Sequence, residues 1–221
     1  MSDTPQIDAV LFDCDGTLID TYEIILASMR YSINEVLGKS RTDAELMHGV
    51  GTPLIDQMVH FCDGDRALAD RIIQIYRDHN DIVHDANVRA FPDTAAALER
   101  LQAAGIKMGV VTSKRHAMAA RGLEMSGISP FLPVLIGHDD CETHKPQPGP
   151  ILLGCEMLGA ASDRTLYVGD SPYDIQAGNA AGCPTAAALW GMFSAEELAA
   201  QSPTYTAATL TELLDQLAIP A

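Results

Sequence analysis

Apolar and polar residues follow one another along this chain in blocks that predict strands and helices in turn. Short apolar runs bounded by turn residues are typical of buried strands, whereas apolar residues at three- and four-residue steps predict helices. On this basis we expect strands at 7–12, 106–111, 134–136, 165–168 and 185–189. We expect helices at 92–104, 114–126, 150–158, 173–181, 195–200 and 210–217.

The stretch from about 20 to 88 shows helical periodicity and no strand pattern. A first helix should end at Gly38, a second should begin at Thr42, and two more should cover 52–61 and 66–84. After residue 89, strands alternate with helices, which is typical of parallel βαβ units. The sequence therefore predicts an α/β fold, a doubly wound parallel sheet interrupted after its first strand by a helical insert. Such an insert would lie over the carboxyl ends of the strands, where these sheets bind ligands.

Two aspartates, Asp13 and Asp15, follow the first predicted strand. Residues i and i+2 of an extended chain face the same side, so both carboxylates can converge on one point. Two carboxylates in such a place repel each other unless a cation or a proton lies between them. Hard oxygen ligands in this arrangement suit Mg²⁺.

Three further strand ends carry compatible chemistry. Thr112, Ser113 and Lys114 follow the strand at 106–111, and a hydroxyl with free N–H groups at a helix start is a natural phosphate seat. Further along, Lys145 lies in the loop after the third strand, and Asp170 and Asp174 follow the fourth. A metal-binding acidic cluster, an anion seat and one ammonium are the parts that phosphoryl transfer needs.

The nucleophile is best assigned to an aspartate, because the chain has no Walker A loop and no candidate serine or cysteine triad. Carboxylates do form aspartyl-phosphate intermediates, and Asp13, at the strand tip, is the better held of the pair. Asp15 would then act as acid toward the leaving group and as base toward the attacking water. The segment Gly49-Val50-Gly51 begins like a dinucleotide fingerprint, but it lacks the third glycine and a preceding strand.

The composition narrows the function classes. The 221 residues include 30 acidic and 14 basic side chains, a formal charge of −16, which argues against a nucleic-acid surface. No apolar run approaches the roughly 20 residues of a transmembrane helix, and the N-terminus lacks a signal-peptide pattern. The five cysteines form no C-x-x-C pair, so we expect free thiols and a cytoplasmic location. A monomer and a homodimer are both compatible with the sequence.

The strand-end residues resemble the four sequence motifs of the haloacid dehalogenase superfamily of phosphohydrolases. The matching segments are Asp13-x-Asp15-Gly16-Thr17-Leu18, Thr112, Lys145-Pro146 and Gly169-Asp170-Ser171-x-x-Asp174. The resemblance implies a Rossmann-like core over 1–18 and 89–221 and an α-helical cap over 19–88. It also implies Mg²⁺ held by Asp13, the backbone carbonyl of Asp15 and Asp170, with Asp174 in support. The phosphoryl group would be bound by Thr112, Ser113 and Lys145.

Within the superfamily, residues 107–113, 144–148 and 174–183 resemble phosphoglycolate phosphatases and bacterial pyrophosphatases. Residues 76–85, with Tyr76-Arg77, Asn80 and His84-Asp85, are most similar to the pyrophosphatase branch. The resemblance implies a Mg²⁺-dependent phosphatase acting on a small phosphorylated metabolite or on pyrophosphate. A sugar phosphomutase of the same fold is the alternative.

The leaving group is not identified by the sequence. A glycolate would favour a carboxylate-binding cation in the cap, for which Arg41 is the candidate, whereas pyrophosphate would need more cation or a second metal. The side chains of Arg41, His48 and Thr52 flank the glycine break and could face the substrate, although a plain helix-connecting loop is the simpler interpretation. We expect Tyr22, Asn80 and His84 to serve helix packing or the surface, and Lys114, Arg115 and His116 to be solvated.

Overall fold

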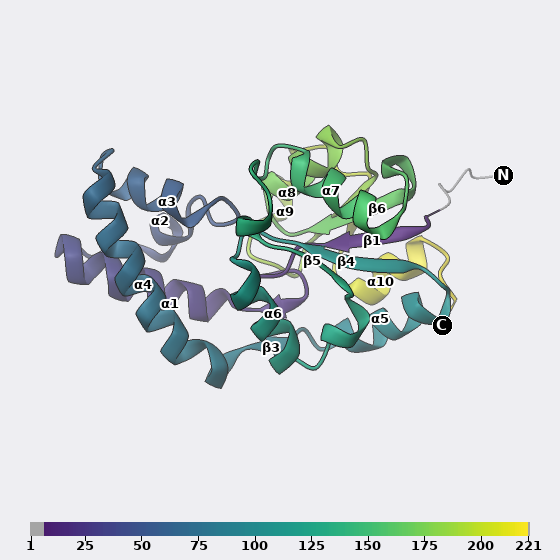
Figure 1. Cartoon of the computed structure of the whole chain (residues 1–221), viewed down its shortest axis with the longest axis horizontal. Helices are drawn as coiled ribbons and strands as arrows, with labels where there is room; N and C mark the ends of the chain where they lie inside the picture. The colour runs from purple at the N-terminus through teal and green to yellow at the C-terminus, as the bar shows by residue number, and fades with distance from the viewer. Residues whose placement is uncertain (1–6, 221) are drawn as a thin grey trace.

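The computed structural model describes residues 7–220, and its centre is a six-stranded sheet in which every neighbouring pair is parallel (Figure 1). The strand order is β5-β4-β1-β6-β7-β8. The strands are β1 (Ala9–Phe12), β4 (Lys107–Val111), β5 (Val134–Ile136), β6 (Thr165–Gly169), β7 (Thr185–Ala188) and β8 (Tyr205–Ala207). The predicted α/β class with a doubly wound parallel sheet is confirmed.

Strand β1 is buried on both faces and shows how the sheet divides the core. Alternate side chains of a strand point to opposite faces, so Val10 and Phe12 pack into one hydrophobic cluster, whereas Ala9 and Leu11 pack into another. Full burial of a side chain of this size contributes roughly 1.5–3 kcal/mol. The helices α5 (Thr94–Ala103), α6 (His116–Met125) and α10 (Leu210–Gln216) cover the first face. The helices α7 (Gly149–Leu158), α8 (Pro172–Ala180) and α9 (Ala195–Ala199) cover the second.

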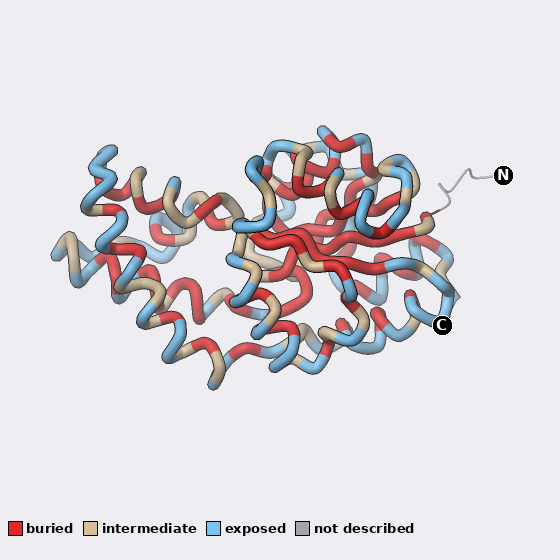
Figure 2. Tube along the Cα trace, viewed as in Figure 1, coloured by how far each residue is buried: buried red, intermediate tan, exposed pale blue. Residues whose placement is uncertain are grey.

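A further layer of helices lies beyond one end of the sheet (Figure 1). It consists of α1 (Tyr22–Leu37), α2 (Asp43–Met47), α3 (Leu54–Phe61) and α4 (Arg66–Asn87). Figure 2 shows buried stripes on the sides where these helices meet, and a hydrophobic cluster of their own fills the space between them. As expected, α1 ends at Gly38 in the left-handed conformation, and Thr42 forms a capping box with Glu45 at the start of α2.

Two short strands connect the helical layer to the sheet. Strand β2 (Ile19–Asp20) pairs antiparallel with β3 (Arg89–Ala90), where the chain leaves the sheet and where it returns. Neither strand was expected from the sequence, because two residues are too few to show a period. Strand β8 was also missed, since it is a partly exposed edge strand without an apolar run. Helix α6 begins at His116 rather than at residue 114, and Arg115 is its N-cap.

Two further observations concern membrane-spanning helices and the cysteines. Within residues 7–220, no helix combines the length and the apolar character needed to cross a bilayer. All five cysteines are free thiols, as expected, and four of them are buried.

Candidate active site

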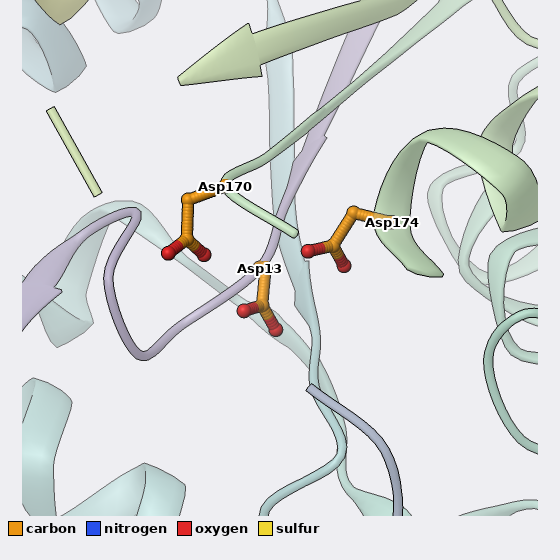
Figure 3. A group of neighbouring side chains, drawn as sticks. All are labelled: Asp13, Asp170 and Asp174. Atoms are coloured by element: carbon orange, nitrogen blue, oxygen red, sulfur yellow. The ribbon is translucent and has the colours of Figure 1, made fainter. Parts of the chain in front are cut away.

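The carboxyl ends of β1 and β6 bring three carboxylates together, as predicted from parallel strands. Asp13 follows β1 and Asp170 follows β6, its neighbour in the sheet, while Asp174 lies in the first turn of α8. Figure 3 shows the three side chains converging on one point, and one oxygen of each lies within 4.8 Å of the others. All three residues are at least 95% buried. The acidic cluster is therefore buried, at the carboxyl end of the central strands.

Lys145 is the positive charge of this cluster. Its Nζ donates to Asp13 Oδ1 at 2.8 Å and to Asp174 Oδ1 at 2.6 Å, and it also reaches the hydroxyl of Tyr167 at 3.3 Å. Burial lowers the pKa of Lys145, but the carboxylates of Asp13 and Asp174 outweigh it and hold that pKa well above its usual value. The ammonium is therefore charged although it is 96% buried.

The donor set fits a divalent cation. Burial raises the pKa of Asp13 to about 7, against the opposing effect of Lys145 and with the help of Asp174. Burial, and next Asp13, also hold the pKa of Asp170 well above its usual value. When all three carboxylates are ionised, Lys145 balances only one of them. Oxygen ligands with excess negative charge are what a hard cation requires, so this cluster could bind a metal ion.

Asp170 is held in a narrow space. The N–H of Met192 donates to its Oδ2 at 2.7 Å, and the hydroxyl of Thr17 donates to its Oδ1 at 3.3 Å. A Cβ atom at Gly16 or at Gly191 would lie 2.2 Å from atoms of this aspartate. Gly16 also has a φ of +82°, so both space and backbone conformation exclude a side chain after Asp15.

Asp174 has two functions, one for each oxygen. Its Oδ2 accepts from the N–H and the hydroxyl of Ser171, at 3.0 and 2.5 Å, which completes the capping box of α8. Its Oδ1 accepts from Lys145 and from the Tyr167 hydroxyl. The helix cap thus fixes the carboxylate whose other oxygen belongs to the acidic cluster.

The side chain of Asp15 lies outside this cluster and pairs with Lys114. Asp15 Oδ1 accepts from Lys114 Nζ at 2.7 Å and from the Thr21 hydroxyl at 2.8 Å. The expectation that Lys114 lies on the solvated surface is wrong, because α6 starts two residues later than predicted and the preceding turn directs this lysine inward. Its side chain is 14% exposed. Two features of the sequence could have indicated the inward direction of Lys114: the chain has only four lysines, and this one follows shortly after a strand end.

Thr112 and Ser113 occupy the end of β4. Thr112 is buried, and its hydroxyl accepts from the N–H of Lys114 at 3.2 Å. The hydroxyl of Ser113 donates to the carbonyl of Gly51 at 2.6 Å. Since Gly51 belongs to the helical layer, this bond connects the loop between α2 and α3 to the end of the sheet beside the acidic cluster.

Gly51 should be intolerant of a side chain for this reason. It has a φ of +99°, and a Cβ atom would lie 2.9 Å from Ser171 Oγ. We expect Gly51→Ala to lower kcat/KM about tenfold or more, because the loop must withdraw from the site. Gly38→Ala is the matched control, since Gly38 also has positive φ but open space around it. Steady-state kinetics and thermal unfolding of both variants check this, and equal kinetic losses in the two would contradict it.

A cavity of about 170 Å³ lies between the helical layer and the strand ends. Asp13, Asp15, Thr112, Lys145 and Asp170 line one side. The helical layer contributes the polar side chains of Thr52, Gln57, Tyr76, Arg77, Asn80 and Asp81, of which Gln57 and Asp81 had not been singled out from the sequence. Arg115 and His138 complete the polar wall from the loops of the sheet. Pockets for drug-sized ligands are roughly 300–1,000 Å³, so this space fits a small substrate.

Of the three residues near the glycine break that could face the substrate, the structure places one at the cavity. Thr52 lines the cavity, but Arg41 and His48 do not. Arg41 lies 3.7 Å from Glu45 and its guanidinium stands over the ring of Phe61. The cation of the helical layer that reaches the cavity is Arg77. Helical spacing from Ile73 and Asn80 places Arg77 on the buried side of α4, although it does not say what that side faces.

Asn80 and His84 differ in their surroundings. Asn80 lines the cavity while its amide donates to Ser28 at 3.4 Å. His84 is fully buried, packs against Gly122 of α6 and does not line the cavity, in agreement with the expected packing role.

Residues 10–188 match a known protein family. These residues match the model of the family described as haloacid dehalogenase-like hydrolase. The chain belongs to this family. The matched range includes all of the strand-end residues described above and the helical layer.

Sequence relatives are similar over nearly the full length. Pyrophosphatase PpaX of Oceanobacillus iheyensis is 36% identical over 209 residues, covering 95% of this chain and 96% of the relative. Pyrophosphatase PpaX of Bacillus pumilus is 35% identical over 208 residues, covering 94% and 95%. Among solved structures, a protein named "predicted phosphatase" from Clostridium acetobutylicum superimposes with a TM-score of 0.87 at 26% identity, covering 97% of this chain and 99% of that one.

These findings confirm the resemblance drawn from the strand-end motifs. The chain is a phosphohydrolase of the haloacid dehalogenase type, with the α/β fold of its structural neighbours. The roles of individual residues, the division of the chain into two domains and the identity of the metal stay predictions.

Proposed function

We propose that this protein is a Mg²⁺-dependent phosphatase that cleaves a small phosphate monoester or phosphoanhydride through an aspartyl-phosphate. The observation that carries the proposal is the buried cluster of Asp13, Asp170 and Asp174 around Lys145, open to a cavity of about 170 Å³. We further propose that residues 1–18 and 89–221 form the catalytic core and that 19–88 form the cap. The separate hydrophobic cluster of the four cap helices supports this division.

In the proposed first step, the Asp13 carboxylate attacks phosphorus and the bond to the leaving-group oxygen breaks. Asp15, which lines the same cavity, gives its proton to that oxygen. In the second step Asp15 takes a proton from water, the resulting hydroxide attacks phosphorus, and the aspartyl ester bond breaks to release inorganic phosphate. Lys114 and Thr21 both donate to Asp15 Oδ1 and orient the side chain, which leaves Oδ2 to carry the proton in both transfers.

The phosphoryl oxygens would be bound by Thr112, Ser113 and Lys145. Lys145 touches Asp13 directly, so its charge lies beside the atom that attacks. Hydrogen-bond donors aimed at developing charge in a buried site are worth far more than in water. For Ser113, substrate would have to take the place of the Gly51 carbonyl that the hydroxyl now contacts.

Mg²⁺ would be held by the carboxylates of Asp13 and Asp170 and by the backbone carbonyl of Asp15, with Asp174 in support. A divalent cation there supplies neutralising positive charge for the phosphoryl group and for the crowded carboxylates. The raised pKa of Asp13, about 7 without a cation, is consistent with a site built to be completed by one.

The name pyrophosphatase, which two of the relatives carry, and the cavity of about 170 Å³ support a small phosphorylated substrate. We propose pyrophosphate or a small phosphorylated metabolite such as phosphoglycolate, and no nucleic-acid partner, given the formal charge of −16. We also propose a cytoplasmic location, because the five cysteines are free thiols.

Removal of the metal tests this function. We expect phosphate release from pyrophosphate or phosphoglycolate to require added Mg²⁺ and to stop with excess EDTA. Asp170→Asn should lower kcat/KM at least about a hundredfold at saturating Mg²⁺, since it removes one proposed ligand. Release that continues in EDTA would contradict the proposal, and interconversion of sugar phosphates without net release would favour the phosphomutase.

A further inference from the structure

Two arginines from different parts of the chain line the cavity above Asp13. Arg77 comes from helix α4 of the helical layer and is partly buried. Arg115 precedes helix α6 on the sheet side. Within residues 7–220, neither guanidinium forms an ion pair within 4.0 Å. Of the lysines and arginines that line the cavity, Lys114 and Lys145 pair with aspartates, which leaves Arg77 and Arg115 without a carboxylate partner among the described residues.

Both arginines line the same cavity, Arg77 partly buried and Arg115 exposed at its rim. Burial lowers the pKa of Arg77, and the charge of Arg115 lowers it next, while Asp70 acts in the opposite direction. Asp81 lines the same cavity one turn beyond Arg77, yet the two form no ion pair within 4.0 Å. Two positive charges on the wall of one cavity repel each other, and an anion bound between them lowers that repulsion. The two arginines therefore give one part of the cavity wall a positive charge that suits a negatively charged ligand.

His138 adds a neutral donor to the same wall. It lines the cavity, and its Nδ1 is buried without a hydrogen-bond partner among the described residues. Burial, and next the charge of His144, lower its pKa, and Arg77 and Asp56 are among the groups that act on it. The imidazole is therefore neutral near pH 7, with one ring nitrogen able to donate. An unpartnered buried polar atom costs free energy that a ligand could recover.

The two lysines at the strand ends lie beside the aspartates, where the proposed function has Lys145 bind the phosphoryl group. Lys145 is held by Asp13 and Asp174, and Lys114 is held by Asp15. The groups proposed to bind the phosphoryl group that Asp13 attacks thus all come from the strand ends and their loops. Arg77 and Arg115 are not needed for that end, so they are free to bind the other end of the substrate.

We propose that Arg77 and Arg115, with His138, bind a negatively charged leaving group. The inference rests on the proposed phosphatase activity and narrows its substrates to molecules that carry a second anionic group beside the phosphoryl group under attack. Two sources share this chemistry, a phosphoanhydride with a free phosphate and a short monoester with a carboxylate. A monoester with a neutral leaving group would leave both arginines unpaired.

The test compares charged and neutral leaving groups of similar size. The substrates are pyrophosphate, phosphoglycolate and 2-hydroxyethyl phosphate, in which a hydroxyl replaces the carboxylate. We expect Arg77→Met to lower kcat/KM roughly 10- to 100-fold for the charged substrate that the wild type prefers, the range for a lost hydrogen bond to a charged group. The same variant should change kcat/KM for 2-hydroxyethyl phosphate less than about threefold. Arg115→Met should show the same pattern.

Two further variants of α4 separate charge recognition from a folding effect. Arg71→Met is the matched control, because Arg71 is exposed on the same helix and does not line the cavity; it should behave as wild type. Arg77→Lys should recover part of the preference for the charged substrate, because it keeps the charge but not the planar fork. The preferred substrate of the wild type identifies the source of the anion.

Two results would overturn the inference: equal losses of Arg77→Met on charged and neutral substrates, or a wild type without preference between them. If the wild type releases phosphate from none of the three substrates, the proposed function fails, and binding alone decides the inference. Calorimetric titration of pyrophosphate and 2-hydroxyethyl phosphate into Asp13→Asn, with and without Arg77→Met, gives that answer. Tighter binding of pyrophosphate that disappears with Arg77→Met supports the anion site, and binding unaffected by Arg77→Met rejects it.

Discussion

Asp13→Asn is expected to lower kcat at least about a thousandfold, because the amide is not a nucleophile toward phosphorus. Asparagine has nearly the same shape as aspartate, so the loss reports chemistry rather than packing. The measurement is steady-state phosphate release at saturating Mg²⁺. Asp163→Asn is the matched control, since Asp163 is an exposed aspartate in the turn before β6, at the opposite end of the strand from Asp170.

Although Asp13→Asn should lower activity, we expect it to raise the stability of the metal-free protein. In the folded protein without a cation, the pKa of Asp13 is raised from 3.8 to about 7, so ionisation of this carboxyl opposes folding. That destabilisation grows as the pH rises from 3.8 through about 7 and is then complete. At pH 8, metal-free Asp13→Asn should therefore unfold at a higher temperature than wild type, and the difference should shrink toward pH 5. Turnover close to wild type in this variant would remove Asp13 as the nucleophile.

Lys145→Met should produce the largest loss of stability. Its ammonium is buried and compensates Asp13 and Asp174, so its removal leaves buried carboxylates without a cation. Breaking a buried pair in this way costs about 3–5 kcal/mol of unfolding free energy. We expect kcat/KM to fall at least about a hundredfold as well, because a charge beside the reacting group is lost. Denaturant unfolding of metal-free protein and phosphate-release kinetics measure the two effects.

The pH dependence separates this effect from a simple packing defect. Lys145 opposes the rise of the Asp13 pKa, so its removal raises that pKa further above about 7. The additional destabilisation is absent while Asp13 is protonated and appears as the pH rises through and beyond 7. The gap to wild type should be wider at pH 8.5 than at pH 6. Lys39→Met is the control, since Lys39 is exposed and its loss should change stability by less than about 0.5 kcal/mol.

A stability gap that does not change with pH would contradict the ionic explanation. A Lys145→Met protein with wild-type stability would show that the ammonium does not compensate these carboxylates.

Much of the fold could be predicted because the sheet obeys short-range rules. The strands at 134–136 and 107–111 agree with prediction to within a residue, since short apolar runs between turn signals have few alternatives. Gly38 and Thr42 were placed correctly at helix ends, because capping depends on residue type at one position. Strand β8 escaped prediction because an edge strand needs no apolar run.

The convergence of Asp13, Asp170 and Lys145 also followed from local information. Parallel neighbours end at the same edge, and the register of β1 with β6 brings Phe12 opposite Val168. Asp13 follows Phe12 directly and Asp170 comes two residues after Val168, so both lie at the same edge of the sheet. The direction of Lys114 did not follow, because it depends on where α6 begins, and a shift of two residues turns the side chain from the surface into the site.

The residues of the helical layer that line the cavity could not be predicted from the sequence. Arg41 was the candidate cation because it lies near the glycine break, whereas Arg77 reaches the cavity from a helix 36 positions further along the chain. Periodicity reveals which side of a helix is buried, but several surfaces can bury it. The buried side of α4 faces its neighbouring helices along part of its length and the cavity at Tyr76, Arg77 and Asn80.

The sequence by itself determined the α/β fold, the order of the strand-end motifs and therefore the reaction class. These depend on residue types at strand ends, and hydrogen-bonded pairing of parallel strands leaves little freedom in where such residues lie. Only the tertiary structure decided that Lys114 pairs with Asp15, that the Gly51 carbonyl accepts from Ser113, and that Arg77 and Arg115 line one cavity. The rotation and tilt of a helix against a sheet are set by side-chain packing between distant segments, and no local pattern encodes them.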